Sequence, residues 1–208
     1  MSTARAGLRP VLWVLLLTAI LVVLGVQFAD RLIAVFVHAH GGEHVFYELQ
    51  TIPAWLGMAA VPVIVVLGLV RLSGLSLPRA GRAVFLAALS FIVAIAIKDA
   101  LKYAFGRPWP ETWIHHNPSF IGTGTYGFFP FHGGPGFASF PSGHMTAITS
   151  IMGVFCAIWP QLRWLWAGLV LATAIGLLGM DYHFLSDIIA GTALGGLVSL
   201  AVVRLNRV

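Results

Sequence analysis

The chain has 208 residues, of which 59% are hydrophobic and only 9% carry a charge, with a mean hydropathy of +0.91. Roughly a quarter of the residues of a soluble domain are charged, so this composition excludes a soluble domain and predicts one integral membrane domain over residues 1–208. The formal net charge of +5 comes from basic residues that form no cluster, which excludes a nucleic-acid partner, and the single cysteine excludes both an intrachain disulfide and a cysteine-based zinc site.

Six apolar stretches, with their flanking residues, are long enough to cross a bilayer core of about 30 Å. They cover residues 11–28, 53–70, 83–103, 145–159, 165–179 and 184–203. We therefore expect an all-α bundle of six transmembrane helices. The first stretch follows Arg5 and Arg9 but lacks a small-residue cleavage site after it, so it is interpreted as a retained anchor and not as a signal peptide.

The basic residues predict the orientation of this bundle in the membrane. With a cytoplasmic N-terminus and six alternating spans, eight of the 12 Lys and Arg residues fall on the cytoplasmic side: Arg5, Arg9, Arg71, Arg79, Arg82, Arg163, Arg204 and Arg207. All seven acidic residues then fall on the opposite side. We expect a multi-pass protein of a bacterial-type inner membrane, with both termini cytoplasmic and the longer polar loops periplasmic; no oligomeric state is indicated.

Residues 30–50 mix charged, histidine and apolar side chains, which predicts an amphipathic helix at the outer surface, broken at Gly41 and Gly42. His38, His40 and His44 are poorly spaced for joint metal ligation across that break. They are interpreted as polar surface residues, and no metal ligand is predicted.

Residues 106–141 form a long loop rich in glycine, proline and aromatic residues. A loop of this length in a compact protein is usually functional or disordered, and its many aromatic residues argue against disorder. We expect a folded loop that carries an active site on the outer face of the bundle.

Two lysines and an arginine lie at the end of the third apolar stretch. Lys98 and Lys102 are one turn apart and share a helix face, and Arg107 follows a glycine that ends the helix. A structural alternative is that these long side chains only snorkel toward the membrane surface.

The residues Pro141-Ser142-Gly143-His144 precede the fourth apolar stretch. Ser142 is a good N-cap and Gly143 permits close approach of a ligand. The free amides at the start of the helix are therefore predicted to form an anion-binding site. His144 stands in the first turn of this helix. A capped membrane helix with an incidental histidine is the structural alternative.

His183 and Asp187 are four residues apart at the start of the last apolar stretch, so they share one helical face. A carboxylate behind an imidazole fixes its tautomer and raises its basicity. An ordinary contact at a helix start is the alternative for this pair.

The expected topology places these three clusters at the same end of the bundle. Together they predict a site of phosphoryl transfer that uses neither a metal ion nor a cofactor. His183 would attack phosphorus, His144 would protonate the leaving oxygen, and Asp187 would orient His183. A covalent phosphohistidine would form and then be hydrolysed. Charge on the phosphoryl oxygens would be stabilised by Lys102, Arg107, Ser142 and Gly143.

These residues resemble the type 2 phosphatidic acid phosphatase (PAP2) family, which is related to vanadium haloperoxidases. The family pattern has three parts: Lys-x6-Arg-Pro, Pro-Ser-Gly-His, and Ser-Arg-x5-His-x3-Asp. The resemblance covers about residues 83–200, and the six-span layout suits the membrane branch of the family. It implies that His183 is the nucleophile and Asp187 its orienting acid.

Two arginines of the family pattern are absent from this chain. Counting from Lys102 places Trp109 at the first position, and counting back from His183 places Leu177 at the second. A hydrogen bond to a charged group contributes roughly 1.5–3 kcal/mol, so other side chains would have to replace them. The candidates besides Arg107 are Lys98, His132, His115 and His116.

The leading hypothesis is a lipid phosphatase or phosphotransferase that acts at the periplasmic face. Its substrate would be a lipid phosphate or diphosphate, such as a polyprenyl diphosphate, phosphatidylglycerol phosphate, phosphatidic acid or a lipid A phosphate. The alternative, motivated by Trp109 and Leu177, is a non-catalytic relative that binds lipid headgroups or a membrane partner.

Overall fold

The computed structural model describes residues 2–41, 44–113 and 116–206. In this part of the chain the regular structure is helical, and the β-type contacts are two isolated bridges, Arg107 to Ala138 and Trp109 to Ser119. The α-helices are α1 (Ser2–Leu24), α2 (Asp30–His40), α3 (His44–Met58), α4 (Ala60–Leu72), α5 (Arg79–Phe105), α6 (Phe120–Thr123), α7 (Gly143–Ile158), α8 (Arg163–Gly179) and α9 (Leu185–Leu205). The predicted all-α class is confirmed.

Five helical stretches are long and apolar enough to cross a membrane: Leu8–His40, Phe46–Leu72, Arg79–Phe105, Pro160–Gly179 and Leu185–Leu205. The predicted number of six is not confirmed, because the fourth predicted span corresponds to α7, which has only 16 residues. Ser142 caps the start of α7, and Trp159 and Pro160 follow its end. The helix is short because proline-containing segments stop it at both ends.

The N-terminal span is longer than expected. Instead of ending at residue 28, the helix continues through a π-helical turn, Gly25–Ala29, directly into α2. Gly41 ends α2, in agreement with the predicted break, but α3 begins at His44 and not at residue 53. Pro53 lies inside α3, as membrane helices tolerate.

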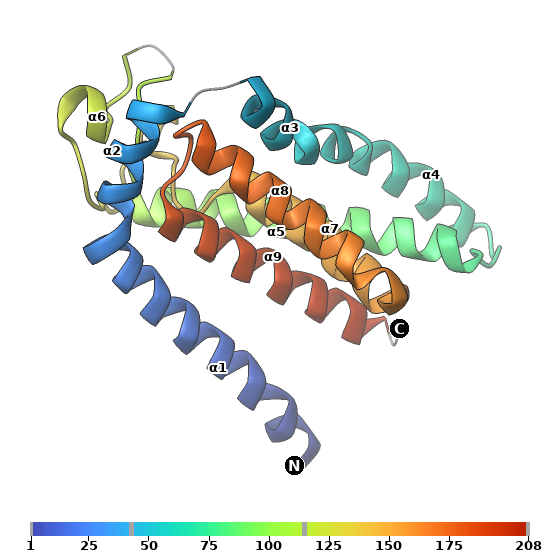
Figure 1. Cartoon of the computed structure of the whole chain (residues 1–208). Helices are drawn as coiled ribbons and strands as arrows, with labels where there is room; N and C mark the ends of the chain where they lie inside the picture. The colour runs from blue at the N-terminus through green and yellow to red at the C-terminus, as the bar shows by residue number, and fades with distance from the viewer. Residues whose placement is uncertain (1, 42–43, 114–115, 207–208) are drawn as a thin grey trace.

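Helix α7 lies at the centre of the bundle and packs against α5, α8 and α9 (Figure 1). Two glycines allow α9 to approach it closely. A Cβ atom at Gly191 would lie 2.5 Å from the carbonyl oxygen of Ser142, and one at Gly195 would lie 2.5 Å from that of Thr146. Close packing is thus the role of these glycines.

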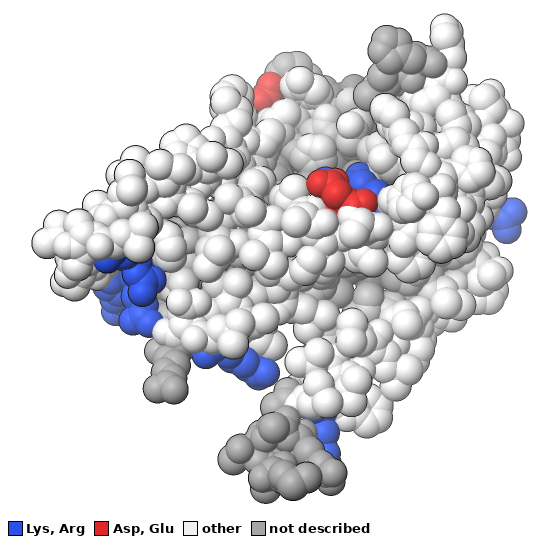
Figure 2. Space-filling view, turned by 180° about the vertical axis from the view of Figure 1, so that it is seen from behind, with Lys and Arg blue, Asp and Glu red and all other residues white. Residues whose placement is uncertain are grey.

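The path of the helices brings the end of α5, the start of α7, the end of α8 and the start of α9 to one end of the bundle (Figure 1). At the opposite end, Arg79 donates to the carbonyl of Ile158 and Arg82 to that of Asn206. Figure 2 shows a mostly uncharged face with Lys and Arg gathered at an edge, and a small group of acidic and basic atoms inside a hollow. The polar groups therefore divide between the two ends of an apolar bundle.

We expect Gly195→Ala to destabilise the protein by about 1–3 kcal/mol, because its methyl group would overlap the backbone of α7. The measurement is the midpoint of thermal unfolding in detergent, which should fall by several degrees. Gly196→Ala is the matched control, since a Cβ there meets only Thr149 at 3.8 Å. Equal unfolding midpoints for the two variants would contradict this packing.

Candidate active site

A cavity of about 360 Å³ opens at the end of the bundle where the polar clusters meet. Its polar end is lined by Lys98, Lys102, Trp109, Gly143, His144, Tyr182 and His183. Its apolar wall is formed by Pro53, Ala54, Gly57, Phe91, Ile95 and Ala147. The cavity therefore joins a cationic, histidine-bearing end to a surface made by α3, α5 and α7.

The two predicted catalytic histidines face the same cavity, His144 from α7 and His183 from the link between α8 and α9. The ring centroids of His144 and His183 lie 6.4 Å apart. His144 is in the first turn of α7, where the Ser142 hydroxyl accepts the amide of Met145 at 3.3 Å. The first amides of a helix have no acceptor within the helix, and Gly143 and His144, which carry two of them, both line the cavity.

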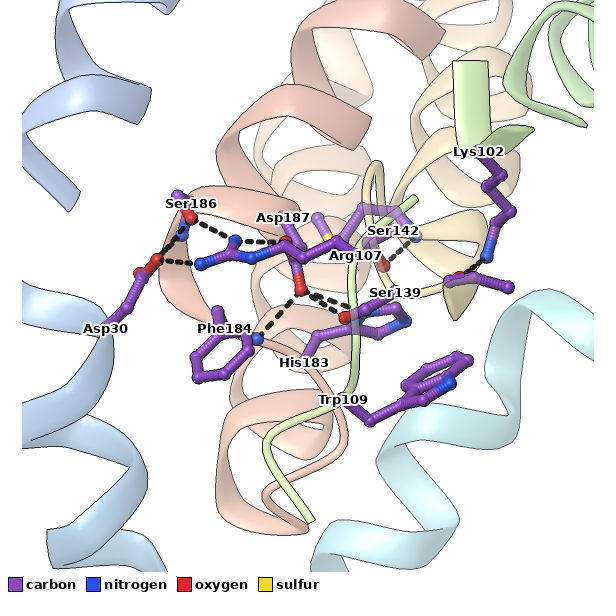
Figure 3. Close-up of polar contacts among 12 residues, drawn as sticks. Asp30, Lys102, Arg107, Trp109, Ser139, Ser142, His183, Phe184, Ser186 and Asp187 are labelled. Carbon is purple, nitrogen blue, oxygen red and sulfur yellow. Dashed lines mark hydrogen bonds and ion pairs between the residues drawn. The ribbon is translucent and has the colours of Figure 1, made fainter. Parts of the chain in front are cut away.

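Asp187 lies behind His183, and its side-chain oxygen Oδ2 accepts several hydrogen bonds (Figure 3). Ser139 donates to it at 2.5 Å and the amide of Phe184 at 3.1 Å, while His183 Nδ1 lies 3.4 Å away. With Nδ1 directed at this carboxylate, Nε2 is the nitrogen left for a substrate. Ser139, which also lies 3.3 Å from His183 Nδ1, was not anticipated from the sequence.

The electrostatics of His183 suit a nucleophile. Burial lowers the pKa of its imidazole, and the hydrogen bond and charge of Asp187 oppose this only in part. The ring is consequently neutral at pH 7, with a lone pair available on one nitrogen.

Arg107 does not line the cavity, which corrects the expectation that it binds phosphate. Its side chain is fully buried and lies on the other side of Asp187 from the His183 ring (Figure 3). The guanidinium donates to Asp187 Oδ1 at 2.5 Å and to Asp30 Oδ2 at 2.7 Å. Burial alone would lower the pKa of Arg107, but these two carboxylates outweigh it and raise the pKa, so the group stays charged.

Asp30 is a second residue of the site that the sequence interpretation missed, since it was assigned to an outer-surface helix. It is 1% exposed, and besides Arg107 it accepts the amide of Ser186 at 3.0 Å and the Ser186 hydroxyl. The available signal was an acidic residue directly after an apolar span, where ionisable residues commonly have a buried partner.

Ser142 also differs from its expected role. Its amide donates to the backbone carbonyl of Asp187 at 3.0 Å, and its hydroxyl caps α7. Ser142 is buried and does not line the cavity. It joins the start of α7 to the first turn of α9, while Gly143 next to it does face the cavity.

Both lysines of the chain, Lys98 and Lys102, line the cavity. Lys102 donates to the carbonyl of Ala138, and Lys98 pairs with the exposed carboxylate of Asp99 at 2.6 Å. A Cβ at Gly143 would lie 3.8 Å from the Lys98 ammonium nitrogen, so this cation is close to the free amides of α7.

Among the predicted replacements for the missing arginines, Lys98 is the one that the structure brings to the cavity. His132 is exposed and packs against Phe137, and His116 is exposed in the loop; neither lines the cavity. His115 lies outside the described residues.

The two positions that depart from the family pattern have different surroundings. The Trp109 ring lies 5.0 Å from the His183 ring and 5.4 Å from the Lys102 ammonium, and its indole nitrogen donates to the carbonyl of Pro135. Leu177 is fully buried in the apolar core. Trp109 is therefore a wall of the cavity, whereas Leu177 is a packing residue of α8.

The chain is similar in sequence to known proteins. A sequence model described as the PAP2 superfamily matches residues 83–207. A lipid A 1-phosphatase of Rhizobium etli (strain ATCC 51251 / DSM 11541 / JCM 21823 / NBRC 15573 / CFN 42) is 33% identical over 104 residues, which is 50% of this chain and 42% of the relative. A lipid A 1-phosphatase of Rhizobium johnstonii (strain DSM 114642 / LMG 32736 / 3841) is 32% identical over 104 residues, 50% of this chain and 40% of the relative.

The matched region thus spans about two fifths of the length of these relatives. No solved structure matches the chain.

We expect Asp30→Ala to destabilise the protein by about 3–5 kcal/mol, because it leaves the buried guanidinium of Arg107 without one of its two carboxylates. Thermal unfolding in detergent measures the loss. Asp99→Ala removes an exposed carboxylate near the same cavity and should change the midpoint little. A similar midpoint for both variants would show that the buried ion pair does not support the fold.

Proposed function

The chain belongs to the PAP2 superfamily, and on that premise we propose that it is a membrane lipid phosphatase that acts through a phosphohistidine intermediate. One observation carries the proposal. His144 of α7 and His183 of the link before α9 face one cavity, with their rings 6.4 Å apart and Asp187 behind His183. Both lysines line the same cavity.

In the first step, Nε2 of His183 attacks phosphorus, and the bond between phosphorus and the lipid oxygen breaks. His144 in its protonated form gives a proton to that leaving oxygen. The nitrogen–phosphorus bond holds the phosphoryl group on His183. Asp187 stabilises the positive charge that develops on the ring.

In the second step, a water molecule attacks the phosphorylated His183 and neutral His144 accepts its proton. The nitrogen–phosphorus bond breaks, inorganic phosphate leaves, and both histidines return to their starting forms. Lys98, Lys102 and the amides of Gly143 and His144 stabilise the charge on the phosphoryl oxygens. No step requires a metal ion; a lipid hydroxyl in place of water would make the reaction a transfer.

The shape of the cavity supports an amphiphilic substrate. Its lysines attract a phosphate, while Pro53, Gly57 and Phe91 offer an apolar surface to the remainder of the molecule. The two relatives bear the name lipid A 1-phosphatase. We therefore propose a lipid phosphate as the substrate class, with a lipid A phosphate as the first member to test.

We further propose that the cavity faces the periplasm in a bacterial-type inner membrane. The support is the distribution of arginines: Arg71, Arg79, Arg82, Arg163 and Arg204 lie at the ends of helices away from the cavity. Basic residues favour the cytoplasmic side. In this orientation both chain termini are cytoplasmic.

A panel of lipid phosphates and diphosphates, presented to the purified protein in detergent, tests the activity by release of inorganic phosphate. We expect His183→Ala to abolish release and also to abolish trapping of a ³²P-labelled protein. His144→Ala should lower turnover by 10²-fold or more, because the leaving oxygen loses its proton donor.

His132→Ala, an exposed histidine outside the cavity, is the control and should retain parental activity. Parental phosphate release by His183→Ala would refute the nucleophile. Binding of lipid phosphates or vanadate by the parental protein, with no release and no labelling, would favour the non-catalytic alternative.

We expect Lys98→Ala and Lys102→Ala each to lower kcat/KM by about 10- to 100-fold. Each removes a charged hydrogen-bond donor to phosphate, which contributes roughly 1.5–3 kcal/mol, and the cavity lining contains no arginine that could compensate. Arg163→Ala, an exposed basic residue at the opposite end of the bundle, is the control for net charge. A loss in that variant as large as in the lysine variants would argue against direct contacts with phosphate.

A further inference from the structure

Three side chains that lie far apart in the sequence meet beside the catalytic cavity without lining it. They are His38 of α2, Glu111 of the loop after α5, and Asp181 of the link between α8 and α9. One ligand-type atom of each lies within 4.8 Å of the others, and His38 Nδ1 is 2.6 Å from Glu111 Oε2. This group is separate from His144 and His183.

Asp181 gives the group a feature that hydrogen bonding does not explain. The residue is 6% exposed, and its oxygen Oδ2 is buried without a hydrogen-bond partner among the described residues. A buried carboxylate without a partner is unfavourable and rare in native proteins. Burial and the neighbouring Glu111 raise the pKa of Asp181 to about 7, with His38 opposing. A cation at this position would supply the missing partner.

We propose that His38, Glu111 and Asp181 bind one Zn²⁺ ion. One imidazole nitrogen and two carboxylate oxygens are common zinc ligands, with bond lengths of about 2.0–2.2 Å. The imidazole disfavours Mg²⁺ and Ca²⁺, which select oxygen ligands. The His38 side chain is 53% exposed and the Glu111 side chain 21%, so both have room to rotate toward a shared ion.

The position of the ligands assigns the ion a structural role. Glu111 follows Trp109 by two residues, and Asp181 precedes His183 by two. His38 lies two turns after Asp30 on α2. The ion would therefore fasten the loop with Trp109, the segment with His183 and the N-terminal helix to one another. It takes no part in the proposed reaction, and the inference does not depend on that reaction.

The test uses the full chain purified in detergent, stripped with EDTA and then titrated with ZnCl₂. We expect one Zn²⁺ per chain by calorimetry and by elemental analysis, and a rise of several degrees in the unfolding midpoint. His38→Ala, Glu111→Gln and Asp181→Asn should each weaken binding by tenfold or more. His40→Ala is the matched control, because this histidine of the same helix bonds to the carbonyl of Phe36 and is outside the group.

Asp181→Asn separates metal binding from a failure to fold. It removes the buried carboxylate charge, so without zinc its unfolding midpoint should equal or exceed that of the stripped parental protein, and zinc should no longer raise it. Absence of stoichiometric zinc binding to the parental chain would overturn the proposal. So would undiminished binding by His38→Ala or Asp181→Asn. Both readouts are independent of phosphate release, so this inference and the proposed function can fail separately.

Discussion

A guanidinium removed from solvent connects three distant parts of this chain. Arg107 lies between Asp30 at the start of α2 and Asp187 at the start of α9, and all three side chains are buried. Isolating such charges from water is costly unless each is paired. The pairing fixes one oxygen of Asp187, which leaves the other to accept Ser139 and Phe184 beside His183. The orientation of the proposed nucleophile thus depends on a helix that precedes the region matched by the family, residues 83–207.

In the proposed function, the cavity would bind the phosphate with groups different from those that the family pattern implies. Trp109 occupies the first arginine position, and its ring lies close to Lys102 and His183. The lysines supply charge without the fixed two-pronged geometry of a guanidinium. The amides of Gly143 and His144 would supply the direction in place of a guanidinium, since they belong to the fixed backbone of a helix start. Charge and geometry are therefore provided by separate groups.

Much of this arrangement could be predicted from the sequence, and the remainder could not, for physical reasons. Hydropathy located the helices, and the i, i+4 spacing of His183 and Asp187 predicted their contact, because both signals are local. The partners of Arg107 could not be predicted from the sequence. They lie 77 and 80 positions away along the chain, and a buried ion pair over such a separation leaves no local sequence pattern. For the same reason, the sequence did not predict the contact of Ser139 with Asp187 or the proximity of His38 to Glu111 and Asp181. From its residue type alone, Arg107 was predicted to bind phosphate, but in the structure its side chain is buried in the interior.

The length of α7 bears on how deep the cavity would lie in a membrane. Sixteen residues rise about 24 Å, some 6 Å less than the hydrocarbon thickness of a typical bilayer. The last turn of α7 is held by Arg79 at the arginine-rich end. With the arginine-rich end at one boundary of the hydrocarbon core, the first turn of α7, with His144, would end short of the other boundary. In the proposed function, a lipid phosphate would then reach this recess while its acyl chains remain in the membrane, and the protein would not need to lift the substrate into water.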